Sequence, residues 1–223
     1  MPNIDFMSSL HKKTERDYLA RVNDQQYPKH KAAELAKKYD FDYWDGDRRI
    51  NYGGYKYIEG RWEQVAKAMI NHYKLPDNAK ILDVGCGKGF LLFDISKCLP
   101  KAEIHGIDVS SYAIENGKEE VKDNMKIGNA TDLPWQDNYF DLVFSIMSLH
   151  CLHSYDLFKA IKEIERVGKR NKYICVESYR DEKEKANLLY WQVTCEAFNT
   201  PREWEWWFNL TGYTGDYSFN YFE

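Results

Sequence analysis

The sequence predicts an α/β fold, a doubly wound and mainly parallel sheet with an N-terminal helical and aromatic extension. Three observations lead to this prediction. An apolar, β-branched run at 81–84 enters a glycine-rich turn, and the apolar start of a helix follows at Phe90. Further strand-like runs at 103–108, 125–128 and 139–145 alternate with helix-like segments. Strands that alternate with helices form a mainly parallel sheet with right-handed crossovers.

Length, charge and cysteine usage narrow the class of protein. The 223 residues suffice for one such domain and an extension, and we predict the division as 1–75 and 76–223. Lys plus Arg number 31 against 35 Asp plus Glu, and a net charge of −4 argues against nucleic-acid binding through general basicity. No membrane-spanning run or secretory signal is found, so a cytoplasmic location is expected. The five cysteines contain no C-x-x-C pair, so we expect reduced thiols and no metal site.

The extension consists of two charged, helix-like segments, near 12–22 and 28–39, and an aromatic stretch at 40–62. The stretch is dense in Tyr, Trp, Arg and Gly and poor in aliphatic residues, a composition that suits a binding surface. We expect it to lie over the strand ends and complete a substrate pocket. An aromatic plug packed under the first helix is an equal alternative. The residues assigned to the substrate here are Arg49, Tyr52, Tyr55 and Arg61.

The glycine-rich turn is the predicted cofactor site. A dinucleotide fingerprint reads G-x-G-x-x-G, whereas here the third glycine comes one residue early and Phe90 stands where a small residue is wanted. A carboxylate two residues before the first glycine repels a pyrophosphate but attracts the ammonium and sulfonium groups of S-adenosylmethionine. A tight turn without a ligand is the alternative. The residues assigned to the cofactor in this stretch are Asp83, Gly85, Cys86, Gly87 and Gly89.

The next strand ends supply more of the predicted cofactor site. Asp108 ends its strand roughly twenty residues past the glycines, where an α/β fold places a carboxylate that binds ribose hydroxyls. Ser110 is a plausible cap of a helix expected to run to about residue 122. Val109 and Ser145, at or just after the ends of their strands, are assigned to the same site.

Two histidines, His150 and His153, follow the fourth strand at the edge where ligands bind. If the acceptor is a hydroxyl, a base must take its proton, and an imidazole titrates near neutral pH. His150 is the first candidate for this catalytic role and His153 the second; a structural role is the alternative. Glu177 and Tyr179, near the end of the fifth strand, are expected at the substrate pocket's rim.

The remaining elements are predicted from apolar spacing. Helices are expected at 59–73, 90–98, 156–167 and 182–198 and from Pro201 onward, and strands at 172–180 and 217–222. Trp204, Trp207 and Phe208 have the spacing of a core stripe.

Four motifs, in this order, resemble those of class I S-adenosylmethionine-dependent methyltransferases: D-V-G-C-G-x-G, G-I-D-V-S, G-N-A-x-x-L-P and F-D-L-V-F-S. The resemblance implies a Rossmann-like fold, methyl transfer from S-adenosylmethionine and an adenine contact by Asn129 and Ala130. The chain departs from the family after the fifth strand, where one clear terminal strand replaces a helix, a strand and an antiparallel return. The sheet is therefore expected to lack its last member or to take it from elsewhere.

The whole chain, including G-G-Y-x-Y-x-x-G-R-W and G-Y-T-G-D-Y, resembles bacterial methyltransferases found with capsule and lipopolysaccharide genes. This resemblance implies O-methylation of a small polar or phosphorylated polysaccharide precursor, such as a sugar, a nucleotide sugar or a phosphoramidate. Arg48, Arg49 and Arg61 suit such an anion. Two alternatives stay open: a non-catalytic cofactor-binding partner of a homologous methyltransferase, and an NAD-dependent oxidoreductase or epimerase, which the glycine spacing disfavours. A homodimer or a paired homologue is compatible with either assignment.

Overall fold

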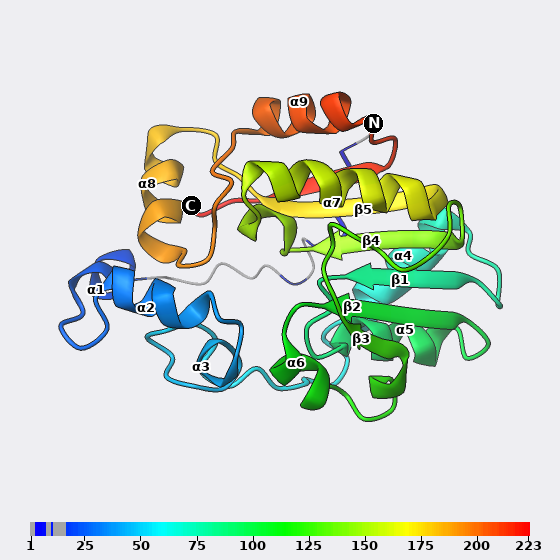
Figure 1. Cartoon of the computed structure of the whole chain (residues 1–223), viewed down its shortest axis with the longest axis horizontal. Helices are drawn as coiled ribbons and strands as arrows, with labels where there is room; N and C mark the ends of the chain where they lie inside the picture. The colour runs from blue at the N-terminus through cyan, green and yellow to red at the C-terminus, as the bar shows by residue number, and fades with distance from the viewer. Residues whose placement is uncertain (1–2, 8–9, 11–16) are drawn as a thin grey trace.

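The computed structural model describes residues 3–7, 10 and 17–223, which form a six-stranded sheet covered by helices (Figure 1). The strand order is β3-β2-β1-β4-β5-β6 and every neighbouring pair is parallel. This confirms the predicted doubly wound parallel sheet, and the order reverses between β1 and β4, the point where such sheets bind ligands. The strands are β1 (Lys80–Val84), β2 (Glu103–Asp108), β3 (Met125–Ile127), β4 (Phe140–Ile146), β5 (Gly168–Glu177) and β6 (Asp216–Asn220).

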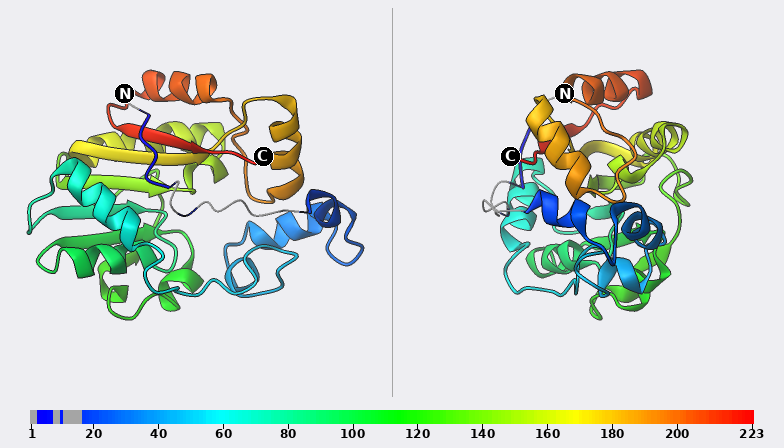
Figure 2. Two further views of the ribbon diagram at one scale, coloured as in Figure 1. Left: turned by 180° about the vertical axis from the view of Figure 1, so that it is seen from behind. Right: turned by 90° about the vertical axis from the view of Figure 1, so that its left-hand side faces the viewer.

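Helices cover both faces of the sheet because consecutive side chains of a buried strand point to opposite faces. Ile81 packs in the core under α4 (Glu63–Tyr73) and α5 (Phe90–Cys98), whereas Leu82 packs in the core under α7 (Ser154–Val167) and α9 (Pro201–Thr211). The view from behind in Figure 2 shows α4 crossing the first of these faces. The short helix α6 (Ser111–Glu115) lies beside β2 and β3.

The predicted core stripe of α9 is confirmed for two of its three members. Trp204 and Phe208 are fully buried against α7 and the sheet, while Trp207 is only partly buried at the edge of that core. The helix starts at Pro201 after a capping box, in which Thr200 accepts from the Glu203 amide and the Glu203 side chain accepts from Thr200. Truncating a buried aromatic side chain of this kind costs about 3–5 kcal/mol of stability.

Four short helices gather beyond the carboxyl ends of the strands, at the left of Figure 1. They are α1 (Tyr18–Asn23), α2 (Lys29–Ala36), α3 (Phe41–Trp44) and α8 (Glu182–Trp191). A small apolar core joins the N-terminal part to the segment after α8: Ala32, Ala36 and Ile50 pack with Val193. Parts far apart in the sequence therefore cover the edge of the sheet at which ligands bind in such folds.

Several elements differ in length from the prediction. The helix expected to run to residue 122 ends at Glu115, where Asn116 leaves the helical conformation (φ −104°, ψ 23°). Gly117 then lies close to Met125; a Cβ on Gly117 would lie 2.4 Å from the Met125 Cε atom. Strand β5 starts four residues early, at Gly168. The helix expected to reach residue 198 ends at Trp191, where Gln192 turns extended (φ −77°, ψ 136°) and lets Val193 enter the small core.

The first expected helix, near 12–22, falls only in part on the described residues. Its positions 12–16 lie outside them, and α1 begins at Tyr18, after Asp17 caps the Ala20 amide. Two single-turn 3₁₀ segments, η1 (Lys122–Asn124) and η2 (Leu149–Cys151), are also present.

The expected terminal strand is β6, which pairs in parallel with the edge of β5. The family's strand after the fifth is thus present as β6, and the described residues form no antiparallel return beside it, which agrees with the expectation that the sheet lacks its last member. Asn3 forms an isolated bridge with Tyr217 on the outer side of β6. Within the described part of the chain, every helix is too short or too polar to cross a bilayer.

Candidate cofactor and acceptor site

A cavity of about 310 Å³ lies at the carboxyl edge of the sheet, between the glycine-rich turn and residues 39–62, here called the aromatic cap. Its lining comes from the turn after β1, the ends of β2 and β4, the segment after β3, and the cap. Most residues assigned to the cofactor from the sequence line it, whereas Asp83, Gly89 and Ser145 lie outside the lining. Those on the lining are Gly85, Cys86, Gly87, Asp108, Val109, Asn129 and Ala130.

The turn after β1 requires glycine at two lining positions. Gly85 (φ +84°) and Gly87 (φ +53°) adopt left-handed backbone conformations that side chains rarely tolerate. A Cβ on Gly85 would lie 2.2 Å from the Ser148 Oγ atom, and one on Gly87 would lie 2.8 Å from the Trp44 ring. The turn is therefore held tightly between the segment after β4 and the aromatic cap.

The amide hydrogens of this turn are already used within the protein. Gly85 and Cys86 donate to the Ile107 carbonyl at 2.8 and 3.1 Å, and Gly87 donates to Asp108 Oδ2 at 2.8 Å. A phosphate-binding turn presents free amides to its ligand. The turn thus lacks the main feature of a pyrophosphate site, in agreement with the prediction from the glycine spacing.

Asp108 presents a carboxylate to the cavity. Its Oδ2 atom accepts from the Gly87 amide and its Oδ1 atom from the Ser110 amide, both at 2.8 Å. Burial raises the pKa of Asp108, although these amide hydrogen bonds act in the opposite direction. Each carboxylate oxygen keeps a second lone pair, which suits the two neighbouring hydroxyls of a ribose.

Asp83, near the end of β1, is a buried carboxylate that is only 6% exposed. It accepts no hydrogen bond from any residue that the structure describes, and burial, with Asp108 next in importance, raises its pKa well above the ordinary value. A buried acid without a partner is costly. A cationic ligand such as the ammonium of S-adenosylmethionine would relieve that cost, so the residues present fit the predicted donor.

Asn129 and Ala130 line the cavity on the far side of Asp108, after β3. The Asn129 side-chain oxygen accepts from the Thr131 amide at 3.0 Å, which holds the turn and leaves the NH₂ group for a ligand. Val109 beside them is 50% exposed, so an apolar surface is open next to the Asp108 carboxylate. This arrangement can take a flat purine ring.

Two contacts fasten the aromatic cap over the turn. The Trp44 Nε1 atom donates to Ser110 Oγ at 2.9 Å, within a buried setting. The Lys88 ammonium bonds both carboxylate oxygens of Asp45, at 2.9 and 2.7 Å, and Tyr112 donates to the same carboxylate at 2.8 Å. The cap is therefore joined to the glycine turn and to the helix that follows Asp108.

Inside the cap, aromatic rings stack upon one another and face the cavity. The Trp44 and Tyr52 rings are nearly parallel, with an angle of 8° and centroids 5.5 Å apart. Tyr55 stacks on Phe90 at 5.0 Å, which explains why a large residue follows the third glycine. Tyr52, Tyr55 and Arg61, three of the four cap residues assigned to the substrate, line the cavity.

The fourth, Arg49, lies elsewhere. Its guanidinium pairs with Asp47 at 2.5 Å, donates to Gln26 and lies over the Tyr27 ring. Arg48 likewise bonds the Asn51 carbonyl and lies over Trp191. Of the three arginines expected to suit an anion, only Arg61 lines the cavity.

The two predicted catalytic histidines lie off the cavity lining. His150 is 2% exposed; its Nδ1 atom accepts from the Glu177 amide and its Nε2 atom lies 3.4 Å from Glu177 Oε2. Burial lowers the pKa of His150 to about 3, so the imidazole is neutral at neutral pH and a weak base. The His153 side chain is 75% exposed at the start of α7, 3.7 Å from Glu196.

The two residues expected at the pocket rim are also away from the cavity. Glu177 is 1% exposed and is held by His150 and Gln192. Tyr179 packs in a separate small core with Leu188 and Phe222. The end of β5 is therefore not part of the cavity wall.

Two cofactor assignments outside the lining have identifiable packing positions. Ser145 is buried and donates to the Val84 carbonyl at 2.7 Å, which ties β4 to β1 beneath the turn. Gly89 (φ +71°) precedes α5, and a Cβ there would lie 2.5 Å from the Met125 sulfur. Both positions shape the support of the cavity.

Several lining residues have no assignment from the sequence. Tyr43, Trp44 and Trp62 lie in the aromatic stretch at 40–62, whose composition is the one signal that could have found them. The others lie beside that stretch, at strand ends or in distant segments, where nothing in the sequence marks them as site residues. They are Met7, Leu10, Tyr39, Ile107, Gly128, Ile146, Met147, Ser148, Cys151 and Leu152.

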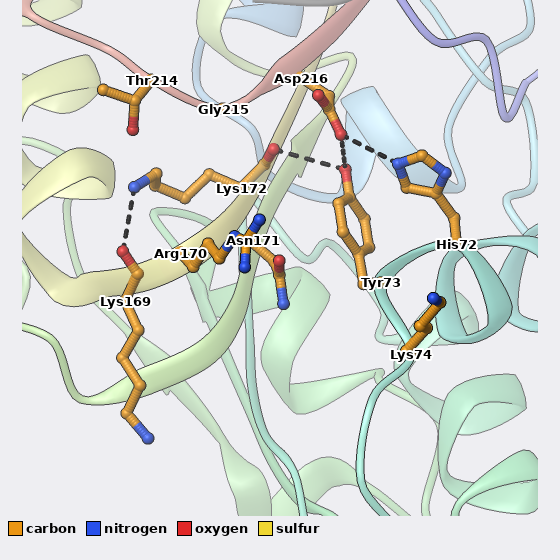
Figure 3. A pocket seen from close by; sticks show the side chains of 10 residues that line it. All are labelled: His72, Tyr73, Lys74, Lys169, Arg170, Asn171, Lys172, Thr214, Gly215 and Asp216. Atoms are coloured by element: carbon orange, nitrogen blue, oxygen red, sulfur yellow. Dashed lines mark hydrogen bonds and ion pairs between the residues drawn. The ribbon is translucent and has the colours of Figure 1, made fainter.

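A larger cavity, of about 700 Å³, lies at the opposite edge of the sheet, where β5 and β6 begin (Figure 3). Two of its charged groups have partners: Asp216 binds His72 at 3.2 Å and Tyr73 at 2.9 Å, and Lys172 binds Glu165 at 3.0 Å. Lys74 ends α4, where a cation complements the helix dipole. Size alone therefore does not mark the site; the smaller cavity holds the glycine turn and Asp108.

Comparison with known proteins gives an independent result. The family described as "Methyltransferase domain" matches residues 75–212, more than half of the chain. Demethylmenaquinone methyltransferase of Symbiobacterium thermophilum is 34% identical over 130 residues, which are 53% of this chain and 50% of that protein. The enzyme of the same name from Staphylococcus aureus is 38% identical over 105 residues, 44% of this chain and 43% of that protein. The chain thus spans about half the length of the curated relatives it matches.

Among solved structures, the YcgJ protein of Bacillus subtilis has the same fold. It superposes with a TM-score of 0.54 at 21% identity, covering 66% of each chain. At this identity the likeness concerns the fold alone. The matched family region contains β1 to β5 and the turn after β1, that is, the core half of the cavity; the aromatic cap lies before it.

Proposed function

Because this chain belongs to the methyltransferase domain family, whose class I members use S-adenosylmethionine, we propose that it transfers a methyl group from that donor to a small-molecule acceptor. The observation that carries the proposal is the position of one cavity. It lies where the sheet order reverses and is bounded by the glycine turn, Asp108 and the aromatic cap. A site of this kind can hold a donor on the sheet side and an acceptor on the cap side.

The donor supplies a methyl group already activated by a positively charged sulfur, so the protein mainly supplies alignment and exclusion of water. Asp108 would accept hydrogen bonds from the ribose hydroxyls, and Asp83, buried behind the lining, would favour the donor's ammonium through its negative charge. Val109, Asn129 and Ala130 would hold the adenine. These assignments agree with two carboxylates whose burial raises their pKa in the absence of a cationic partner.

The aromatic cap would form the acceptor side. Tyr52 and Tyr55 offer flat surfaces and hydroxyls, and Arg61 offers a cation. Trp62, Met147 and Leu152 add apolar surface. Lys88 and Trp44 tie the cap to the glycine turn and to Ser110. The segment that would cover the donor therefore also forms the acceptor side. His150 then acts as a positioning residue that supports the segment after β4, through Glu177.

Binding of S-adenosylhomocysteine, the demethylated donor, tests the proposal directly. Isothermal titration should show one site per chain, and NADH should not compete for it. Lack of binding at millimolar concentration, or preferential binding of NADH, would refute the proposal and restore the oxidoreductase alternative.

For the acceptor, the sequence resemblance supports a polar or phosphorylated precursor of a surface polysaccharide, and Arg61 on the cavity supports an anionic group. The demethylmenaquinone relatives suggest a second candidate, an aromatic ring carrying hydroxyls. The observation that favours this second candidate is the aromatic and apolar lining around Tyr52, Tyr55 and Trp62. A methyl-transfer screen that tests sugar phosphates, nucleotide sugars and phosphoramidate in one group and hydroquinones in another distinguishes the two candidate acceptors.

A non-catalytic role beside a homologous methyltransferase predicts a different outcome of the same screen. The donor would bind with full affinity, no acceptor would be methylated by the chain alone, and activity would appear when a second chain is added. Turnover by the purified chain alone would exclude that role.

A further inference from the structure

We propose that the acceptor enters this site with its methyl-accepting oxygen already ionised, and that Arg61 is the cation that selects it. The acceptor is thus an oxyanion such as a carboxylate or a phosphate, and not a neutral alcohol. This inference rests on the proposed function and narrows the acceptor to one chemical class.

The charge on the cavity wall is the first step. Among the described lining residues, only Asp108 and Arg61 carry a formal charge. Asp108 already accepts two amide hydrogen bonds and faces the donor's ribose. Arg61 lies within 4 Å of no carboxylate in the described part of the chain, and it is exposed. Among the described residues, this one cation on the acceptor side has no anionic partner, so an anionic ligand can pair with it.

The second step is the lack of a proton acceptor on the same wall. Four tyrosines line the cavity: Tyr39, Tyr43, Tyr52 and Tyr55. Burial raises the pKa of each, for Tyr52 to about 12. Their hydroxyls therefore stay protonated near neutral pH and act as hydrogen-bond donors.

The thiols behave in the same way. Burial raises the pKa of Cys86 well above its ordinary value and that of Cys151 to about 12. No described residue on the lining is a histidine, lysine or glutamate. His150 lies behind the wall, enclosed by Glu177 and the segment at 196–197, which donates to the His150 carbonyl. Apart from Asp108, whose carboxylate already accepts two amide hydrogen bonds, the described wall therefore offers hydrogen-bond donors and no base for a sugar hydroxyl.

An ionised oxygen needs no such base. It forms its bond to the methyl carbon while the carbon–sulfur bond of the sulfonium donor breaks, and the electron pair of that bond stays on sulfur. One negative and one positive charge disappear together, and no proton is released. A neutral alcohol would have to lose a proton in the same step, which needs a general base.

Electrostatics point the same way. Arg61 lines the cavity, and a bound donor would add the positive charge of its sulfonium, so an anionic acceptor would be attracted by both charges. A guanidinium binds carboxylates and phosphates through paired, charge-assisted hydrogen bonds. The Tyr52 and Tyr55 hydroxyls can add neutral donors to the same anion.

Titration of the S-adenosylhomocysteine-saturated protein with three probes tests the inference. Benzoate and phenyl phosphate carry an oxyanion, whereas benzamide has nearly the shape of benzoate without its charge. We expect both anions to bind at least about tenfold more tightly than benzamide. Arg61→Met should abolish this preference without changing the affinity for S-adenosylhomocysteine or the unfolding temperature.

Arg202→Met, on the exposed side of α9, removes an arginine far from the cavity and serves as the matched control; it should keep the preference. Three results would overturn the inference: equal binding of benzamide, a preference that survives Arg61→Met, or no anion binding at about 10 mM, well above the range in which most enzymes bind their substrates. Those results leave donor binding intact. Failure of S-adenosylhomocysteine itself to bind would instead refute the proposed function and this inference with it.

Discussion

The Lys88 ammonium lies 2.9 and 2.7 Å from the two carboxylate oxygens of Asp45, so the glycine turn and the aromatic cap are joined by one ion pair. The Lys88 side chain is only 6% exposed and also donates to the Tyr55 carbonyl at 3.1 Å. Asp45 in turn accepts from Tyr112 and from the Tyr55 amide. A residue of the glycine turn thus holds the aromatic cap, the proposed acceptor side of the site.

Lys88→Met should loosen the cap because it leaves the Asp45 carboxylate without its cation. Breaking a fully buried pair costs about 3–5 kcal/mol; Asp45 is partly exposed, so we expect about 1–3 kcal/mol in urea unfolding. Amide exchange should speed up in residues 45–57. The double variant Lys88→Met, Asp45→Asn should regain part of the loss, since it removes the orphaned charge. Unchanged exchange in the single variant would show that the pair does not hold the cap.

Gly87→Ala should weaken donor binding and lower stability together. The backbone is left-handed (φ +53°), and the new Cβ would lie 2.8 Å from the Trp44 ring. Strain of this kind costs about 1–3 kcal/mol, and we expect S-adenosylhomocysteine affinity to fall more than about tenfold.

Gly212→Ala is the matched control for that variant. Gly212 has a similar backbone (φ +71°), but a Cβ there would have no neighbouring atom within 4 Å, and it ends α9 away from the cavity. The change should lower the unfolding temperature and leave the affinity unchanged. Equal affinity losses in the two variants would mean that strain alone, and not the Trp44 contact, is responsible.

Asp108→Ala should lose most of the donor affinity. The carboxylate anchors the Gly87 and Ser110 amides at 2.8 Å and would bind the ribose, and hydrogen bonds to charged groups are worth about 1.5–3 kcal/mol each. Titration with S-adenosylhomocysteine should therefore show a loss of about tenfold or more. The exposed Asp132→Ala controls for net charge. Full affinity in Asp108→Ala would contradict the ribose assignment.

His150 should make stability depend on pH. Its pKa is about 3 in the folded protein because it is buried, against about 6.5 in an unfolded chain. Between about pH 6.5 and pH 3, the imidazole binds a proton in the unfolded chain but not in the folded protein. The free energy of unfolding therefore falls as the pH is lowered through this range, and it is unaffected by His150 above about pH 6.5. Wild type should lose up to about 1.4 kcal/mol per pH unit relative to His150→Gln in this range.

Urea unfolding at about pH 7.5, 6 and 5 measures this difference. A flat difference for His150→Gln would mean that the imidazole titrates normally. Once an acceptor is known, the same variant separates its two roles. A folded His150→Gln protein that binds both substrates but transfers no methyl group would restore His150 as the base.

Prediction from the sequence is most accurate where the signal is local. Three features depend only on short stretches of sequence: the positive φ angles at Gly85 and Gly87, the acid at the end of β2, and the alternation of strands and helices. The fold class and the proposed donor side of the cavity follow from these features. Helix ends are predicted less accurately. The segments that follow Glu115 and Trp191 pack on other parts of the chain, Gly117 on Met125 and Val193 in the small core, and the local sequence does not show these contacts.

By itself, then, the sequence determined the wound parallel sheet and the turn with its two acids, because backbone conformation and strand alternation depend on neighbouring residues. Only the tertiary structure decided which side chains meet at the acceptor side. Arg49 and Arg61 have the same chemistry and lie close in the sequence, yet one pairs with Asp47 and the other lines the cavity. Likewise His150 is enclosed behind the wall by residues at 177 and 196. Burial and pairing depend on distant parts of the chain, and they set which groups can touch a ligand and which proton each one carries.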